Sequence, residues 1–255
     1  MSGSRIARIV VALASVVALP VRSAAQQETQ PVVYGAYYHC APDQLARMDS
    51  VLRSFWAPLA DKQVAAGNAT TWGWLSHHTG GVWNRAFYFI SADGDKAFDA
   101  VDALNGEAVR TNAALVRETA RICSTHEDYV WSRVSGSQPV AELAQNRPAS
   151  GYSIYYVCSP AREARADSIV MNSFAPTLNG QVQSGGMHSW TWLAHVIGGK
   201  YRRLLATDGA SPKALANSMG NVVTELQAKQ PAAFREFSEI CDSHRDYIWN
   251  ITGPQ

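Results

Sequence analysis

Residues 71–81 and 189–199 concentrate side chains of the kind that bind ligands. The first segment reads TWGWLSHHTGG and the second reads SWTWLAHVIGG, so two tryptophans, one histidine and a glycine pair keep their places. Indole rings make apolar walls for aromatic molecules, and imidazole transfers protons or binds metal ions. With an arginine on the next predicted strand, these residues are the candidate ligand-binding positions: Trp74, His77, Arg85, Trp192, His195 and Arg203.

Strand alternation decides which of these side chains can meet. It sends the two tryptophans of the first segment to one face and His77 to the other. If the glycine pair forms a two-residue hairpin loop, Arg85 shares the face of Trp74. A structural interpretation competes with ligand binding, because buried aromatics usually form core contacts and arginine stacks on tryptophan as a cation–π pair. The core candidates are Trp72, Trp74, Trp83 and Phe87.

Four cysteines suggest a second kind of chemistry. Cys123 follows Cys40 by 83 residues, and Cys241 follows Cys158 by the same distance. An even number of cysteines in an exported chain indicates disulfides, although four cysteines allow three pairings. A zinc site that includes Cys123 and His126 is the competing interpretation, but the C-x₂-H spacing lacks the second closely spaced pair of zinc sites. We therefore predict disulfides and no metal site.

The N-terminus predicts export. Within residues 1–25, Arg5 and Arg8 precede an apolar stretch from Ile9 to Val21 and a small-residue cleavage site. This is the pattern of a secretory signal peptide, and a membrane span would need about 20 apolar residues. Without this segment the chain has 19 basic residues against 21 acidic ones, too few and too scattered to attract nucleic acid. We expect a periplasmic or secreted protein with no membrane span after cleavage.

The rest of the chain repeats itself with an offset of 118 residues. YYHCAP from residue 37 returns as YYVCSP from residue 155, and CSTHEDYVW from residue 123 returns as CDSHRDYIW from residue 241. Asp49 and Asp167 also correspond. The predicted organisation is a first repeat over residues 32–134, a linker over 135–150 that is rich in Ser, Gln, Pro and Ala, and a second repeat over 151–253.

Six elements are predicted in each repeat. Pro42 opens the first helix and Pro58 kinks or restarts it. In the first repeat, strands are predicted over 32–39, 70–78, 83–90 and 128–134, and helices over 42–55 and 95–123. The order β-α-β-β-α-β is the ferredoxin-like split βαβ pattern.

Two such units in tandem resemble the dimeric α+β barrel superfamily, in which two units place their sheets face to face. The resemblance implies an α+β fold of two tandem ferredoxin-like repeats that pair their sheets as an intramolecular barrel. The alternative is two independent α+β sandwiches joined by the linker. The resemblance also selects one cysteine pairing, since the last strand of such a unit lies antiparallel beside the first. The implied disulfides are Cys40 with Cys123 and Cys158 with Cys241.

The resemblance implies one of three activity types known in the superfamily: cofactor-free monooxygenases, haem enzymes, and small-molecule lyases or isomerases. None of their motifs transfers residue by residue, and a haem enzyme would need a proximal histidine on a helix. The histidine near a predicted helix end, His126, adjoins a predicted disulfide, so we expect no cofactor. The sequence favours a non-catalytic binding module for an apolar small molecule or a partner protein. The alternative is a cofactor-free monooxygenase-like or related enzyme, with His77 and His195 as candidate bases.

Overall fold

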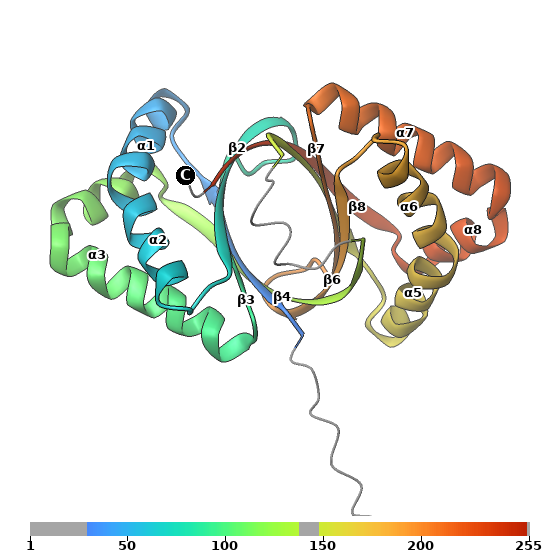
Figure 1. Ribbon diagram of the computed structural model, residues 1–255, viewed down its shortest axis with the longest axis horizontal. Coiled ribbons are helices and arrows are strands. Elements are labelled where there is room, and N and C mark those ends of the chain that lie inside the picture. The colour runs from blue at the N-terminus through green and yellow to red at the C-terminus, as the bar shows by residue number, and fades with distance from the viewer. Residues whose placement is uncertain (1–29, 138–147, 254–255) are drawn as a thin grey trace, which may run out of the picture.

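Eight strands of the described residues close into one barrel, and helices cover two opposite sides of its outer surface (Figure 1). The structure is a computed structural model that describes residues 30–137 and 148–253. The first half contains β1 (Val32–His39), α1 (Leu45–Val51), α2 (Ala57–Ala65), β2 (Thr71–Gly80), β3 (Arg85–Ser91), α3 (Gly94–Ile122) and β4 (Thr125–Gly136). The second half contains β5 (Ser150–Val157), α5 (Glu163–Ile169), α6 (Ala175–Gln183), β6 (Ser189–Ile197), β7 (Arg203–Gly209), α7 (Pro212–Lys229), α8 (Pro231–Ile240) and β8 (Ser243–Thr252).

The strand order around the barrel is β1-β3-β2-β8-β5-β7-β6-β4. Neighbours within each half are antiparallel, and the halves meet along two further antiparallel pairs, β2 with β8 and β4 with β6. Because the two sheets are hydrogen-bonded to each other at both edges, the alternative of two independent sandwiches is wrong. Closure also leaves neither sheet with an unpaired edge.

The outward face of each half-barrel carries a helical layer. In Figure 1, α1, α2 and α3 lie on one side of the barrel and α5 to α8 on the other. Strand alternation turns the tryptophans of β2 and β6 toward these helices, where Trp72, Trp74, Trp190 and Trp192 are at most 3 % exposed. The other face of every strand points into the barrel.

Prolines shape the first helical segment of each half. Pro42 begins a 3₁₀ turn before α1, in agreement with its predicted place at a helix start. A π-helical turn over Leu52–Trp56 then joins α1 to α2, just before Pro58. Since Pro58 has no N–H to donate to the preceding turn, the wider π turn lets the helix continue past it. The second half has the same feature over Val170–Phe174.

The connection between β2 and β3 is not the predicted two-residue glycine loop. The β2–β3 pairing ends with Ser76 opposite Arg85, whereas Thr79 and Gly80 pair with β8. Trp83, predicted to lie on a strand, belongs to this longer connection and turns into the barrel, where it is 1 % exposed. The prediction failed because barrel closure pairs Thr79 and Gly80 at the end of β2 with Ile248 and Tyr247, far away in the sequence, which local turn propensity does not reveal.

The predicted disulfides are confirmed: Cys40 is bonded to Cys123 and Cys158 to Cys241. Each bond joins the end of a half's first strand to the start of its last strand, which pair antiparallel. The predicted signal peptide and most of the predicted linker lie outside the described residues. Among the described helices, none has the length and apolar character that crossing a membrane requires.

Candidate functional site

Trp74 and Arg85 meet on the outer face of the barrel, as strand alternation predicts, but a carboxylate joins them. The Asp49 carboxylate accepts two hydrogen bonds from Arg85, at 2.7 Å from Nε and 2.6 Å from Nη2. It also accepts one from Trp74 Nε1 at 2.9 Å. The Arg85 side chain is 8 % exposed. This arrangement satisfies a buried cation and a buried indole N–H, which is what a structural cluster requires.

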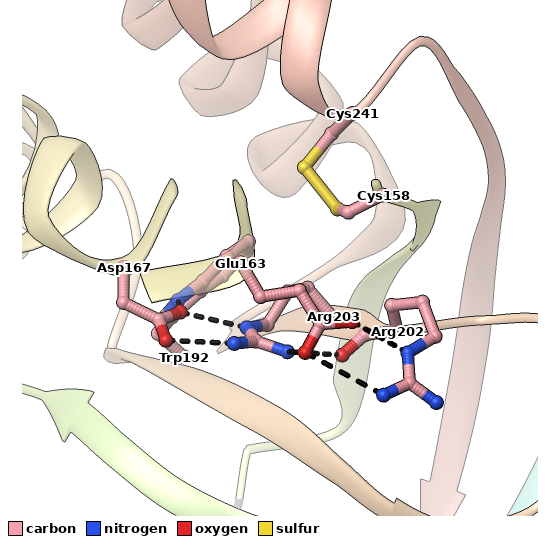
Figure 2. Close-up of a disulfide and its surroundings, with 7 residues drawn as sticks. All are labelled: Cys158, Glu163, Asp167, Trp192, Arg202, Arg203 and Cys241. Carbon is pink, nitrogen blue, oxygen red and sulfur yellow. Dashed lines mark hydrogen bonds and ion pairs between the residues drawn. A yellow bond between two sulfur atoms is a disulfide. The ribbon is translucent and has the colours of Figure 1, made fainter. Parts of the chain in front are cut away.

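The second half holds the corresponding cluster with an added acid (Figure 2). Asp167 accepts hydrogen bonds from Arg203 Nε and Nη2, both at 2.7 Å, and from Trp192 Nε1 at 2.8 Å. Glu163 Oε2 lies 2.9 Å from Arg203 Nη1, and Glu163 Oε1 lies 2.6 Å from Arg202 Nε. Burial alone would raise the pKa of Glu163, but the hydrogen bonds and positive charges of Arg202 and Arg203 together hold it below its ordinary value.

The two predicted histidines point the other way. His77 and His195 lie on the inward face of β2 and β6, near one end of the barrel. His77 Nε2 lies 2.7 Å from the carbonyl oxygen of Gly80, and His195 Nδ1 lies 2.9 Å from Arg202 Nη1. Burial and the positive charge of Arg202 lower the pKa of His195. The six predicted residues therefore do not converge on one cavity, and their ligand-binding role stays a prediction.

Sequence reasoning missed the aspartates that organise these clusters. Asp49 and Asp167 carry a signal that could have found them, since they keep the same place in the two halves and belong to helices that face the tryptophan strands. His126, placed near a helix end by the sequence, lies instead on β4, where its Nε2 is 3.3 Å from Asp128 Oδ2.

Aromatic side chains fill much of the barrel interior. Trp83 stacks between Tyr37 and Tyr247, with ring centroids 4.4 and 5.2 Å apart. Tyr129 stacks on Trp131 at 5.0 Å, and the corresponding rings of the second half stack at 4.8 Å. Burial raises the pKa of Tyr37 to about 12, so its phenol keeps its proton. A cavity of about 150 Å³ remains within the barrel beside these rings.

A larger cleft, of about 460 Å³, lies between the outer face of the second half-barrel and its helices. Ile154 of β5 and Leu205 of β7 form its sheet wall. Its helix wall is apolar along α6, α7 and most of α8, and is made by Leu178, Met219, Val222, Val223, Leu226, Phe234 and Phe237. Cys241 also lines the cleft, so the Cys158–Cys241 disulfide ties the end of α8 to β5 beside it.

The polar side chains of this cleft gather where β8 begins. Tyr152 donates a hydrogen bond to Asp246 Oδ2 at 3.2 Å, and burial together with the Asp246 carboxylate raises the pKa of Tyr152. Asp246 Oδ1 is buried and accepts no hydrogen bond. His244 Nε2 lies 3.6 Å from this oxygen, beyond hydrogen-bonding distance. A carboxylate oxygen and an imidazole thus lie side by side at the edge of an apolar cleft.

The cleft does not fit haem. A haem enzyme of the kind considered from the sequence would need a proximal histidine on a helix, and the helix residues that line the cleft offer only apolar groups and the Ser238 hydroxyl. His244 belongs to a strand at the edge, with its side chain 53 % exposed. Over the described residues there is also no group of three or more His, Cys, Asp or Glu arranged to hold a metal ion.

Comparison with known proteins identifies the fold. No protein-family model and no curated protein matches the sequence. A candidate monooxygenase from Fusobacterium nucleatum subsp. nucleatum superposes with a TM-score of 0.60 at 9 % identity, over 89 % of this chain and 95 % of that one. An anthrone oxidase-like protein superposes with a TM-score of 0.55 at 11 % identity, over 89 % and 94 %.

A mutant chlorite dismutase from Candidatus Nitrospira defluvii, in complex with cyanide, is also similar, with a TM-score of 0.52 at 10 % identity over 88 % and 92 % of the two chains. These structures have dimeric α+β barrel folds, and the present chain shares that architecture. At identities this low, the structural similarity establishes the fold alone and assigns no site residue.

Proposed function

We propose that this protein binds an apolar, ring-containing small molecule in the cleft between β5, β7, β8 and helices α6 to α8. The observation that carries the proposal is the cleft itself, with its volume of about 460 Å³ and its apolar walls. Ligand sites in proteins are typically concavities of about 300–1,000 Å³ lined by apolar and aromatic groups, with a few polar groups that orient the ligand. Tyr152, His244 and Asp246 supply such groups at one edge.

The proposed setting is an exported protein built from two fused ferredoxin-like units. The element order and strand pairing of the two halves, the 118-residue offset and the fold of the structural neighbours support the fused pair. Two disulfides support an oxidising compartment, in which such bonds persist. The sequence pattern of residues 1–25 supports export.

A fluorescent apolar probe tests the binding function. N-phenyl-1-naphthylamine is uncharged and brightens in apolar surroundings, so we expect a saturable rise in its emission at a stoichiometry of one. Val223 lines the cleft and its side chain reaches the surface at 40 % exposure, so Val223→Trp should block the cleft without disturbing the core. The matched control is Asn105→Trp, at the corresponding exposed position of α3. Saturable binding that is insensitive to Val223→Trp would overturn the assignment of the site.

One observation favours a second, catalytic function at the same cleft. Asp246 Oδ1 is a buried carboxylate oxygen with no hydrogen bond, next to His244, and a free acceptor beside an apolar cleft can remove a proton from a bound carbon or phenol acid. A cofactor-free oxygenation of an aromatic substrate begins with such a deprotonation. This assigns the base to Asp246 and His244 in place of the predicted His77 and His195.

Anthrone is a suitable probe of this second function, because one structural neighbour is described as anthrone oxidase-like. Its oxidation by O₂ yields anthraquinone and water, which absorbance and oxygen uptake follow directly. We expect turnover that Asp246→Asn abolishes while naphthylamine binding persists. The matched control is Asp128→Asn, at the corresponding position of β4. Absence of turnover by the native protein would reject this reaction and leave the binding function in place.

A further inference from the structure

The interior of the barrel holds a second cavity whose lining differs between the two halves of the chain. Most aromatic residues of the interior recur at the 118-residue offset, such as Tyr37 with Tyr155 and Trp131 with Trp249. The cavity of about 150 Å³ lies toward the barrel end at which β1 begins and β7 ends; both halves line it, and several of the corresponding positions there hold different residues. Such a difference is what separates a site from a packing feature shared by both halves.

One pair of facing residues explains why the two sides of the cavity differ. Gly73 of β2 lies opposite Tyr88 of β3, and a β-carbon at Gly73 would come within 2.4 Å of the Tyr88 ring. The aromatic ring thus covers a glycine in the first half. The corresponding pair in the second half is Thr191 opposite Ala206, and both line the cavity. Replacement of a tyrosine by an alanine leaves the volume open.

The polar groups around the cavity are equally one-sided. Arg133 lines the cavity at the position that corresponds to Ile251, and Asp208 lines it at the position that corresponds to Ile90; both isoleucines also line the cavity. Burial lowers the pKa of Arg133, and Ser189 Oγ donates a hydrogen bond to Asp208 Oδ1 at 2.7 Å. One cation and one carboxylate therefore lie along a mostly apolar wall. Together they fit an uncharged group that can both accept and donate hydrogen bonds.

A buried donor points to the same ligand chemistry. Trp249 is fully buried and its Nε1 has no hydrogen-bond acceptor among the described residues; the same holds for the corresponding Trp131, but of the two only Trp249 lines the cavity. A buried N–H without an acceptor costs about 1–3 kcal/mol, and native structures rarely leave one. An oxygen atom on a molecule in this cavity would supply the acceptor.

We propose that the barrel cavity is a second binding site, for an uncharged single-ring aromatic molecule with one hydroxyl or carbonyl oxygen. A cavity of about 150 Å³ is the size that accommodates a benzene-like ring. The ring lies against Leu193, Leu204 and Tyr155, and the oxygen lies among Trp249, Arg133 and Asp208. This site is separate from the proposed cleft, because the cavity lies inside the barrel between the two halves, the cleft lies outside the second half-barrel, and the two share no residue.

The test uses 4-fluorophenol as the probe, with ¹⁹F NMR titration of the full mature chain. We expect one saturable site, and about tenfold weaker binding of fluorobenzene, which lacks the oxygen. The double variant Thr191→Gly/Ala206→Tyr recreates the Gly73–Tyr88 pair and should fill the cavity. It should remove 4-fluorophenol binding and leave naphthylamine binding in the cleft unchanged. Val223→Trp should remove naphthylamine binding and leave 4-fluorophenol binding unchanged.

Location is checked with a crystal of the 4-bromophenol complex, in which the anomalous signal of bromine marks the ring. Bromine inside the barrel, lost in the double variant, supports the proposal. Water alone in the cavity of such a crystal overturns it, and so does equal affinity for 4-fluorophenol and fluorobenzene. Binding that survives the double variant, with its thermal unfolding temperature near the native one, also overturns it. If the double variant does not fold, Thr191→Gly/Ala206→Phe takes its place. It fills the same volume, and we expect the same loss of 4-fluorophenol binding.

Discussion

Arg85 and Arg203 occupy corresponding places in the two halves, yet their surroundings differ. Each forms two hydrogen bonds with one aspartate, Asp49 or Asp167, that also accepts from a tryptophan. Arg203 has a second carboxylate within 2.9 Å, that of Glu163, whereas the first half has a leucine at the corresponding position. One aspartate is therefore enough to hold a buried arginine at this point of the fold.

The addition in the second half extends the cluster along the surface. Glu163 also pairs with Arg202, and Arg202 reaches His195. The first half has Asn84 in place of Arg202, and Asn84 instead makes hydrogen bonds to the backbone N–H and carbonyl of Cys40. The comparison shows that both halves share an Asp–Arg–Trp cluster, whereas the extension through Glu163, Arg202 and His195 is found in the second half.

The largest effect we expect comes from the disulfides, which ought to fasten the two halves equally. Each closes a loop of the same length, with a sequence separation of 83 residues. Removing one pair, by Cys40→Ala/Cys123→Ala or by Cys158→Ala/Cys241→Ala, should lower the free energy of unfolding by about 2–5 kcal/mol. Urea unfolding monitored by circular dichroism measures both losses. If only one of the two double variants lost stability, the two disulfides would not be equivalent.

The aspartates should distinguish the halves. Asp49→Ala leaves Arg85 buried without any carboxylate, which typically costs about 3–5 kcal/mol. Asp167→Ala leaves Glu163 beside Arg203, so we expect a loss smaller by about 1–2 kcal/mol. The control is Asp242→Ala, at an exposed position. Equal losses in the same urea assay would show that Glu163 contributes nothing to the burial of Arg203.

The fold could be predicted from the sequence because it rests on local and repeated signals. The alternation around Trp72 and Trp74, the prolines that open helices, and the 118-residue offset each depend on residues close in sequence or on their recurrence. The cysteine pairing followed once the strand order was assumed. Barrel closure was implied by the resemblance, and the register that places Trp83 inside the barrel was not.

The candidate sites were beyond sequence reasoning for a physical reason. The polar side chains of the cleft are Tyr152 of β5 and His244 and Asp246 of β8. Tyr152 and Asp246 are 94 residues apart in the sequence and come together only because β5 pairs with β8. The barrel cavity depends on a missing ring at Ala206, and an absent side chain leaves no motif. The sequence singled out residues that recur in both halves, which is the signal of the shared core. The proposed sites lie in the second half and inside the barrel, where the halves differ.

A smaller effect should follow from the acidity of Glu163. Desolvation raises its pKa in the folded protein, but the hydrogen bonds and charges of Arg202 and Arg203 together outweigh desolvation, so the pKa is lowered. A lowered carboxyl pKa contributes stability that is present above the unfolded-state value of about 4.3 and is lost as the pH falls through the folded-state value. Glu163→Gln should therefore flatten the decline of stability below that pH. Thermal unfolding between pH 7 and 3 tests this, with Glu239→Gln, at an exposed position, as the control.

The smallest effect concerns His195, at the far end of the same network. Its pKa is lowered first by burial and next by the positive charge of Arg202, so the folded protein binds a proton there less readily than the unfolded chain does. As the pH falls below the unfolded-state value of about 6.5, this histidine reduces stability, and the reduction is complete below its folded-state pKa. Arg202→Met removes the nearby charge and should raise the pKa of His195. NMR titration of the imidazole resonances measures the shift, with Lys213→Met as a distant control. A pKa of His195 that stays unchanged in Arg202→Met would mean that burial alone sets it, and that the network of the second half ends at Glu163.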